Sequence, residues 1–255
     1  MKSRTKSSIL FTLIILVFVA CGEKHGEDQS LGPEEYSNIG MPDPSRIWTY
    51  EDYENACVIL DNLKTMRPYS LPRYRSARSG KYFSRIVEPE NLSFVQDDTI
   101  PLHDRAYRIQ EYMDIQGYLI TIYTTMDTAR QMYNSELIEL YIFGITIAQN
   151  MLDLGQMINE SVDENDMQMQ YAFQSIQNMY IRTVLFVLEN QSKANFFKEE
   201  DLARLSQFIS ESILLNEDWI VPEAMEEIKQ RIRRIADDTS SERIRDAYVK
   251  LIEDK

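Results

Sequence analysis

Histidine, cysteine and glycine are scarce in this sequence, and their scarcity excludes several classes of site. Only two histidines, two cysteines and eight glycines occur among 255 residues. The glycines are spaced too irregularly to form GxGxxG or GxxxxGK(S/T), which excludes the common glycine-rich phosphate loops. Four of the glycines lie in the first 40 residues, and no proline occurs between Pro101 and Pro222. Because turns between strands depend on glycine, this distribution argues against a long all-β domain.

Positive charge is also scarce. The chain has 27 Lys and Arg residues against 41 Asp and Glu residues, which gives a net charge of −14. This balance argues against nucleic acid as a partner, because binding to phosphates needs a cationic surface. The apolar share of 44% is enough for a sizeable core, so most of the chain is expected to fold.

The usual residues of catalysis and metal binding are missing from the part that is expected to fold. His103 is the only histidine there, and its place beside Asp104 at the start of a predicted helix indicates an ordinary surface residue. GxSxG, CxxC and HExxH do not occur, and the acidic run 163–166 does not continue into a calcium-loop pattern. We therefore expect no cofactor and no metal, and we name no catalytic residue.

The N-terminus has the order of segments that is typical of a signal peptide. Lys2, Arg4 and Lys6 precede an apolar run over 9–20, which is followed at once by Cys21. The run is shorter than the roughly 20 apolar residues that a bilayer-spanning helix needs. Cleavage before the cysteine removes three cations and no acids, so the net charge changes from −14 to −17.

Residues 18–21 (Phe-Val-Ala-Cys) resemble the lipobox of bacterial lipoprotein precursors, with Phe18 at a position where that class usually has leucine. In that class the cysteine becomes the first mature residue and carries the lipid. The resemblance covers residues 1–21 only. It implies acylation of Cys21, by palmitate or a similar fatty acid, and a membrane-anchored place in the cell envelope. By resemblance to Gram-negative lipoproteins, Gly22 favours the outer membrane over the inner membrane. The sequence does not decide between the periplasmic face and the surface face of the outer membrane.

The composition divides the chain into three predicted segments. A signal peptide at 1–20 is followed by a flexible lipidated tether at 21–45 and by a helical domain at 46–255. The tether segment is rich in Gly, Pro, Glu, Asp and Ser, which cannot bury a core. A flexible chain of this length spans roughly 25–30 Å on average, so the domain is expected to stay near its membrane.

Apolar residues recur at helical spacing through most of the predicted domain. They predict an all-α helical bundle of five to seven helices, with a long irregular loop at 67–101 between the first two. Within this loop we expect a short extended piece at 82–87 and a turn of helix after Pro89. The apolar segment 135–159 is interpreted as a buried central helix rather than a membrane span, because it carries acids such as Glu139. The expected helices cover 50–66, 102–125, 135–159, 164–190, 199–215, 222–236 and a last segment from 242.

Two features of these helices indicate close packing. Gly144 and Gly155 lie inside a predicted helix, where each glycine costs about 1 kcal/mol relative to alanine, so another helix is expected to approach closely at both positions. Cys57 lies on the apolar stripe of the first helix and is interpreted as a core residue. If Cys21 carries a lipid, no intramolecular disulfide is available, and the domain depends on its core for stability.

The cations are concentrated in one segment. Six cations and no acid fall within 67–85, and tyrosines are interleaved with them. We favour the interpretation that these side chains fasten a long loop to the acidic bundle, and we keep an anion-binding or partner-binding site as the alternative. The candidate residues of that site are Arg73, Tyr74, Arg75, Arg78, Lys81 and Arg85. A second basic cluster at 229–234 lies in the last turns of a predicted helix, where cations complement the helix dipole, and is interpreted as structural.

These observations favour a lipid-anchored cell-envelope protein that acts as a non-enzymatic binding or scaffolding module. Its expected partners are the membrane, through the lipid anchor, and another envelope protein or an anionic glycan. Two alternatives stay open. A hydrolase of envelope glycans would use paired carboxylates such as Glu136 and Glu139. An immunity or inhibitor protein would instead present a concentrated acidic patch to a basic target.

Overall fold

The computed structural model describes residues 28–124, 132–160, 167–192 and 197–252. The predicted signal peptide, Cys21 and His25 lie outside the described residues. The same holds for the acidic run 163–166.

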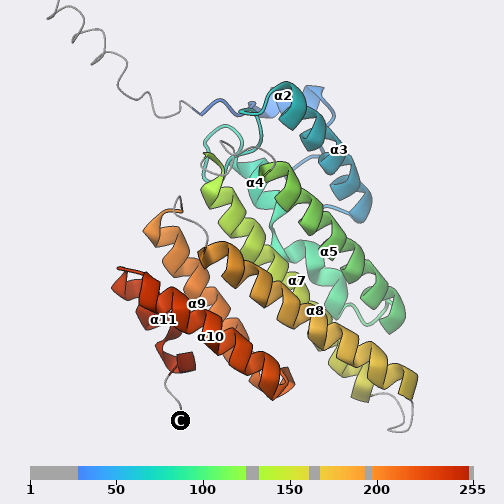
Figure 1. The fold of residues 1–255 in the computed structure, drawn as a ribbon. Helices are drawn as coiled ribbons and strands as arrows, with labels where there is room; N and C mark the ends of the chain where they lie inside the picture. The colour runs from blue at the N-terminus through green and yellow to red at the C-terminus, as the bar shows by residue number, and fades with distance from the viewer. Residues whose placement is uncertain (1–27, 125–131, 161–166, 193–196, 253–255) are drawn as a thin grey trace, which may run out of the picture.

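The described residues form α-helices and short 3-10 helices, with no strand among them, which confirms the all-α prediction (Figure 1). Seven of the α-helices are the long ones that the sequence predicts, and two short ones are additional. The elements are α2 (Pro33–Asn38), α3 (Tyr50–Met66), α4 (Gly80–Ile86), η1 (Pro89–Gln96), α5 (Leu102–Thr124), α7 (Asn134–Glu160), α8 (Met167–Ser192), α9 (Glu199–Leu215), η2 (Glu217–Trp219), α10 (Pro222–Asp238) and α11 (Glu242–Ile252).

Local sequence signals set several of these boundaries. At the start of α3 the Thr49 hydroxyl accepts a hydrogen bond from the Asp52 amide at 3.3 Å, and the Asp52 carboxylate accepts one from the Thr49 amide at 2.8 Å. This reciprocal cap satisfies two amides that a helix terminus otherwise leaves unpaired. Pro222 occupies the first turn of α10, where its missing amide hydrogen costs nothing.

Helix α7 is the centre of the bundle and packs against α5, α8 and α9, as Figure 1 shows. Among the described residues it is the one helix long and apolar enough to cross a membrane, and 72% of its most apolar window is buried inside the protein. A Cβ atom at Gly144 would overlap the side chain of Gln116 on α5, and one at Gly155 would lie 3.1 Å from Ile176 on α8. The predicted close approach of neighbouring helices at both glycines is therefore confirmed.

The N-terminal part of the domain begins earlier than the sequence composition indicates. Residues 28–45, which we predicted to belong to a flexible tether, are folded onto the domain and contain α2. Leu31, Tyr36 and Met41 are buried, and the Tyr36 hydroxyl donates a hydrogen bond to the carbonyl of Ser70 at 2.7 Å. These few apolar residues, spaced among Gly, Pro and Glu, are enough to hold the segment in the core, although its average composition resembles that of a linker.

The loop between α3 and α5 is also more regular than predicted. Residues 82–87, expected to be extended, belong mostly to α4, because Tyr82, Phe83 and Ile86 share one buried helical face. The predicted turn of helix after Pro89 is confirmed as η1.

Cys57 is buried on α3, as predicted, with 4% of its surface exposed. Burial raises the pKa of its thiol to about 12, so the reactive thiolate is almost absent at neutral pH.

We expect iodoacetamide to leave Cys57 unmodified in the folded protein and to modify it rapidly in concentrated urea, as read by mass spectrometry of the peptide. Rapid native-state modification of Cys57 would contradict this placement.

Candidate functional site

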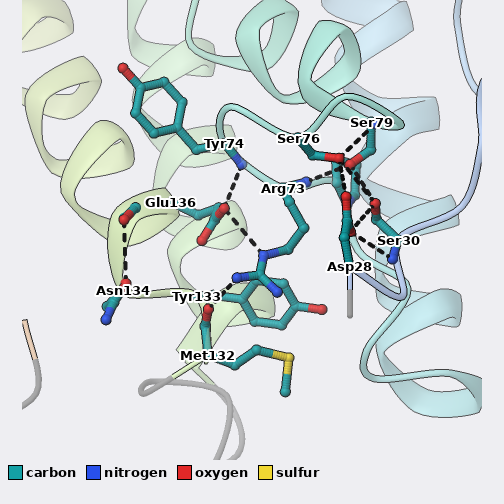
Figure 2. Close-up of polar contacts among 12 residues, drawn as sticks. Asp28, Ser30, Arg73, Tyr74, Ser76, Ser79, Met132, Tyr133, Asn134 and Glu136 are labelled. Atoms are coloured by element: carbon teal, nitrogen blue, oxygen red, sulfur yellow. Dashed lines mark hydrogen bonds and ion pairs between the residues drawn. The ribbon is translucent and has the colours of Figure 1, made fainter. Parts of the chain in front are cut away.

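Arg73 fastens the basic segment to the central helix. Its Nε atom lies 3.3 Å from Oε1 of Glu136, a side chain on α7 that is only 2% exposed. Its Nη2 atom donates a hydrogen bond to the carbonyl of Met132 at 2.8 Å, and its guanidinium lies over the ring of Tyr133. The amide of Tyr74 donates to the same Glu136 carboxylate, as Figure 2 shows. Arg73 is therefore paired with a buried carboxylate, while 28% of its side chain remains exposed.

A second set of polar contacts joins the same segment to the start of the described chain (Figure 2). The hydroxyl of Ser76 donates to the carboxylate of Asp28, and the hydroxyl of Ser79 donates to that of Ser30 at 2.7 Å. Ser79 also accepts a hydrogen bond from the amide of Arg73 at 2.9 Å. Burial would raise the pKa of Asp28, but the hydroxyls of Ser30 and Ser76 hold it below its usual value. The segment is thus fixed on two sides.

Between these attachments, three cations surround an open hollow. Arg75, Lys81 and Arg85, together with Pro44, Tyr74, Ser76, Gly80, Ser84 and Glu88, line a space of about 430 Å³ that we call the basic hollow. Among the described residues, none of these three cations forms an ion pair with a carboxylate. Glu88 is the one acidic lining residue, so cations outnumber acids in the lining.

The three cations are held in different ways. Arg75 has a φ of +59°, a left-handed conformation that is uncommon for a residue with a side chain, and its guanidinium stacks over Tyr74 at 4.7 Å from the ring centre. Nε of Arg85 donates to the carbonyl of Pro44 at 3.1 Å, which leaves its other donors available. Lys81 is exposed to solvent. Contacts within the protein thus partly order the side chains of Arg75 and Arg85.

The structure therefore divides the predicted site. It brings Tyr74, Arg75, Lys81 and Arg85 together around the basic hollow. Arg78 does not line it and instead pairs with Glu35 on α2 at 3.3 Å, with both side chains about half exposed. Sequence reasoning missed Ser84, whose one signal is its position between Lys81 and Arg85, and Pro44, for which the sequence holds no signal.

The paired carboxylates considered for hydrolysis are each occupied by an arginine. Glu136 binds Arg73, and Oε1 of Glu139 lies 2.6 Å from Nη2 of Arg204 on α9. Both carboxylates are almost closed off from solvent. This arrangement does not favour their use as an acid and base on a bound glycan, which needs two accessible carboxyl groups.

His103 is exposed, as predicted, with its Nε2 atom 3.1 Å from the Asp104 carboxylate. In the second basic cluster, Arg231 pairs with Glu227 at 2.9 Å. The predicted place of this cluster at the end of its helix is wrong, because α10 continues to Asp238 and its last turn holds no cation. The described residues contain no group of three or more His, Cys, Asp or Glu side chains placed to hold a metal ion.

Glu136 should give the protein a measurable pH dependence. Burial raises the pKa of its carboxyl above the usual 4.5, and the opposing effects of Arg73 and the Tyr74 amide do not cancel it. Between pH 4.5 and the raised pKa, the folded protein holds this proton more often than the unfolded chain does, so stability falls as pH rises. In Glu136→Gln this contribution disappears. Urea unfolding across that range should show the wild type losing stability relative to Glu136→Gln as pH rises, whereas parallel curves would contradict the assignment.

The described chain is an all-α helical bundle with a basic hollow beside the point where the folded domain begins. No protein-family model matches it, and neither the curated proteins nor the solved structures give a significant match.

Proposed function

We propose that this chain is a lipid-anchored cell-envelope protein that acts as a non-enzymatic binding or scaffolding module, with the basic hollow as its contact surface. One observation supports the basic hollow as the contact surface. In a chain with 41 acids and 27 Lys and Arg residues, three cations line one hollow and pair with no carboxylate of the described residues, although the segment that holds them is fixed at both sides.

The lining suits an anionic group. A guanidinium offers parallel donors that match a carboxylate or phosphate, and stacking on an aromatic ring reduces the freedom it loses on binding. Arg75 is stacked on Tyr74 in this way, and Arg85 is oriented by Pro44. Ser84 adds an exposed hydroxyl to the lining. An anionic glycan, an acidic protein surface and a lipid headgroup all carry a group of this kind.

The lipid anchor is supported by the lipobox resemblance and is tested by metabolic labelling. Cells that express the wild type or Cys21→Ala are grown with radioactive palmitate, and the purified proteins are compared. We expect label in the wild type and none in the variant. Equal labelling of the two proteins would refute lipidation at this cysteine.

The contact surface is tested by charge reversal. Arg75→Glu, Lys81→Glu and Arg85→Glu are combined in one variant, and Arg243→Glu, Arg245→Glu and Lys250→Glu on α11 form the matched control. Because all six side chains are at least partly exposed, both variants should unfold near the wild-type urea midpoint. Only the first should lose the envelope component that co-purifies with the wild type after cross-linking of intact cells. Equal retention by both variants would refute the proposed surface.

A further inference from the structure

We propose that the basic hollow binds the headgroups of anionic phospholipids in the bilayer that holds the lipid anchor, so that this end of the domain lies against the membrane. The inference rests on the proposed anchoring at Cys21, and it names the partner of the proposed contact surface.

The first argument is the length of chain between the anchor and the hollow. The carboxylate of Asp28 binds Ser76, and Ser76 itself lines the basic hollow. Six residues separate Cys21 from Asp28, so the two α-carbons are at most about 25 Å apart even when the chain is fully extended. A lipid on Cys21 therefore keeps Asp28, beside the basic hollow, within about 25 Å of the lipidated residue, so the hollow is able to reach the headgroups of the same bilayer.

The second argument is the arrangement of the helices around this end. In Figure 1 the described chain begins beside α2 and α4. Helix α4 contains part of the basic segment, and α2 lies next to that segment. Helices α10 and α11 lie in the lower part of the molecule. The side chains of Lys81 and Arg85 both come from α4. The end that the anchor would hold nearest the membrane is thus also the end that carries the hollow.

The third argument is charge. An anionic surface acts over a Debye length of about 8 Å at physiological ionic strength, so acidic side chains that lie farther than this from the membrane are largely screened. The cations of the hollow lie within that range when the hollow faces the headgroups, and each Lys or Arg near an anionic surface strengthens binding about fivefold. Such attraction is weak for a free protein, but the anchor raises the effective concentration of lipid at the hollow, so weak contacts are sufficient.

The test compares lysine reactivity on two membranes. The full lipidated protein is reconstituted into vesicles of phosphatidylcholine alone or of phosphatidylcholine with phosphatidylglycerol, and is then treated briefly with acetic anhydride. Acetylation is measured by mass spectrometry at Lys81 in the hollow and at Lys250, an exposed lysine on α11. We expect phosphatidylglycerol to slow the acetylation of Lys81 at least fivefold and to leave Lys250 unchanged. Protection of Lys81 should disappear in Arg75→Glu/Arg85→Glu and at high salt.

The outcomes separate this inference from the function on which it rests. If the protein does not float with vesicles, the lipid anchor is refuted, and the inference with it. If it floats but Lys81 reacts equally on both membranes, the inference alone is overturned. Protection of Lys81 by an envelope protein fraction, without protection by phosphatidylglycerol, would also overturn it and would assign the hollow to a protein partner.

Discussion

Replacing Arg73 with alanine should destabilise the protein by about 3–5 kcal/mol, because it leaves the Glu136 carboxylate buried without its cationic partner. Glu136 is 2% exposed, and one of its oxygens already has no hydrogen-bond partner. The loss of Arg73 also removes the hydrogen bond to the Met132 carbonyl and the contact with Tyr133. The change is measured as the free energy of unfolding in urea at neutral pH.

Arg78→Ala is the matched control, since it removes an arginine from the same segment. Its pair with Glu35 is about half exposed, and exposed pairs of this kind contribute about 1 kcal/mol or less. In the double variant Arg73→Ala/Glu136→Leu, part of the lost stability should return, because the unpaired buried charge is gone. Similar small losses for Arg73→Ala and Arg78→Ala would show that Arg73 does not fasten the segment.

Tyr36→Ala should cost about 3–5 kcal/mol, the range for truncating a fully buried aromatic side chain. Tyr36 is 0% exposed, packs against Tyr82 with ring centres 4.6 Å apart, and donates a hydrogen bond to the Ser70 carbonyl. Its loss opens a cavity between α2 and α4 and leaves that carbonyl without this partner. The effect is read from the thermal or urea unfolding transition followed by circular dichroism.

Ile39→Ala, on the same segment, is the control for this prediction. Ile39 is 40% exposed, so its truncation should change stability far less. If Tyr36→Ala unfolded at the same urea concentration as the wild type, residues 28–45 would behave as the tether that their composition predicts, and the short link between Cys21 and the basic hollow would be wrong.

The long helices could be predicted from the sequence because each carries apolar residues at helical spacing. The range expected for the first helix, 50–66, agrees with α3, which has both an apolar stripe and a reciprocal cap at Thr49 and Asp52. The range 199–215 also agrees with α9, which has an apolar stripe but no side-chain hydrogen bond at its N-terminal cap. A stripe that continues over 17 residues is therefore enough to predict a helix of this length.

The short helices and the hollow could not be predicted with the same success, because distant contacts decide them. Helices of six or seven residues, such as α2 and α4, form only where packing stabilises them. Which arginine forms an internal ion pair depends on which acid lies near it in the folded structure. Arg73 meets Glu136, which is 63 residues away in the chain, and nothing in the basic segment distinguishes it from Arg75.

The central claim is that this protein meets its partner through the basic hollow, and site-specific photo-cross-linking in intact cells tests it most directly. A benzophenone amino acid is placed at Ser84, in the hollow, or at Gln207, in the separate hollow between α9 and α11. The account predicts strong adducts from Ser84, whether with lipid or protein, that disappear when Arg75, Lys81 and Arg85 are changed to glutamate, and few adducts from Gln207. Adducts from Gln207 alone, or adducts from Ser84 that survive the charge reversal, would contradict it.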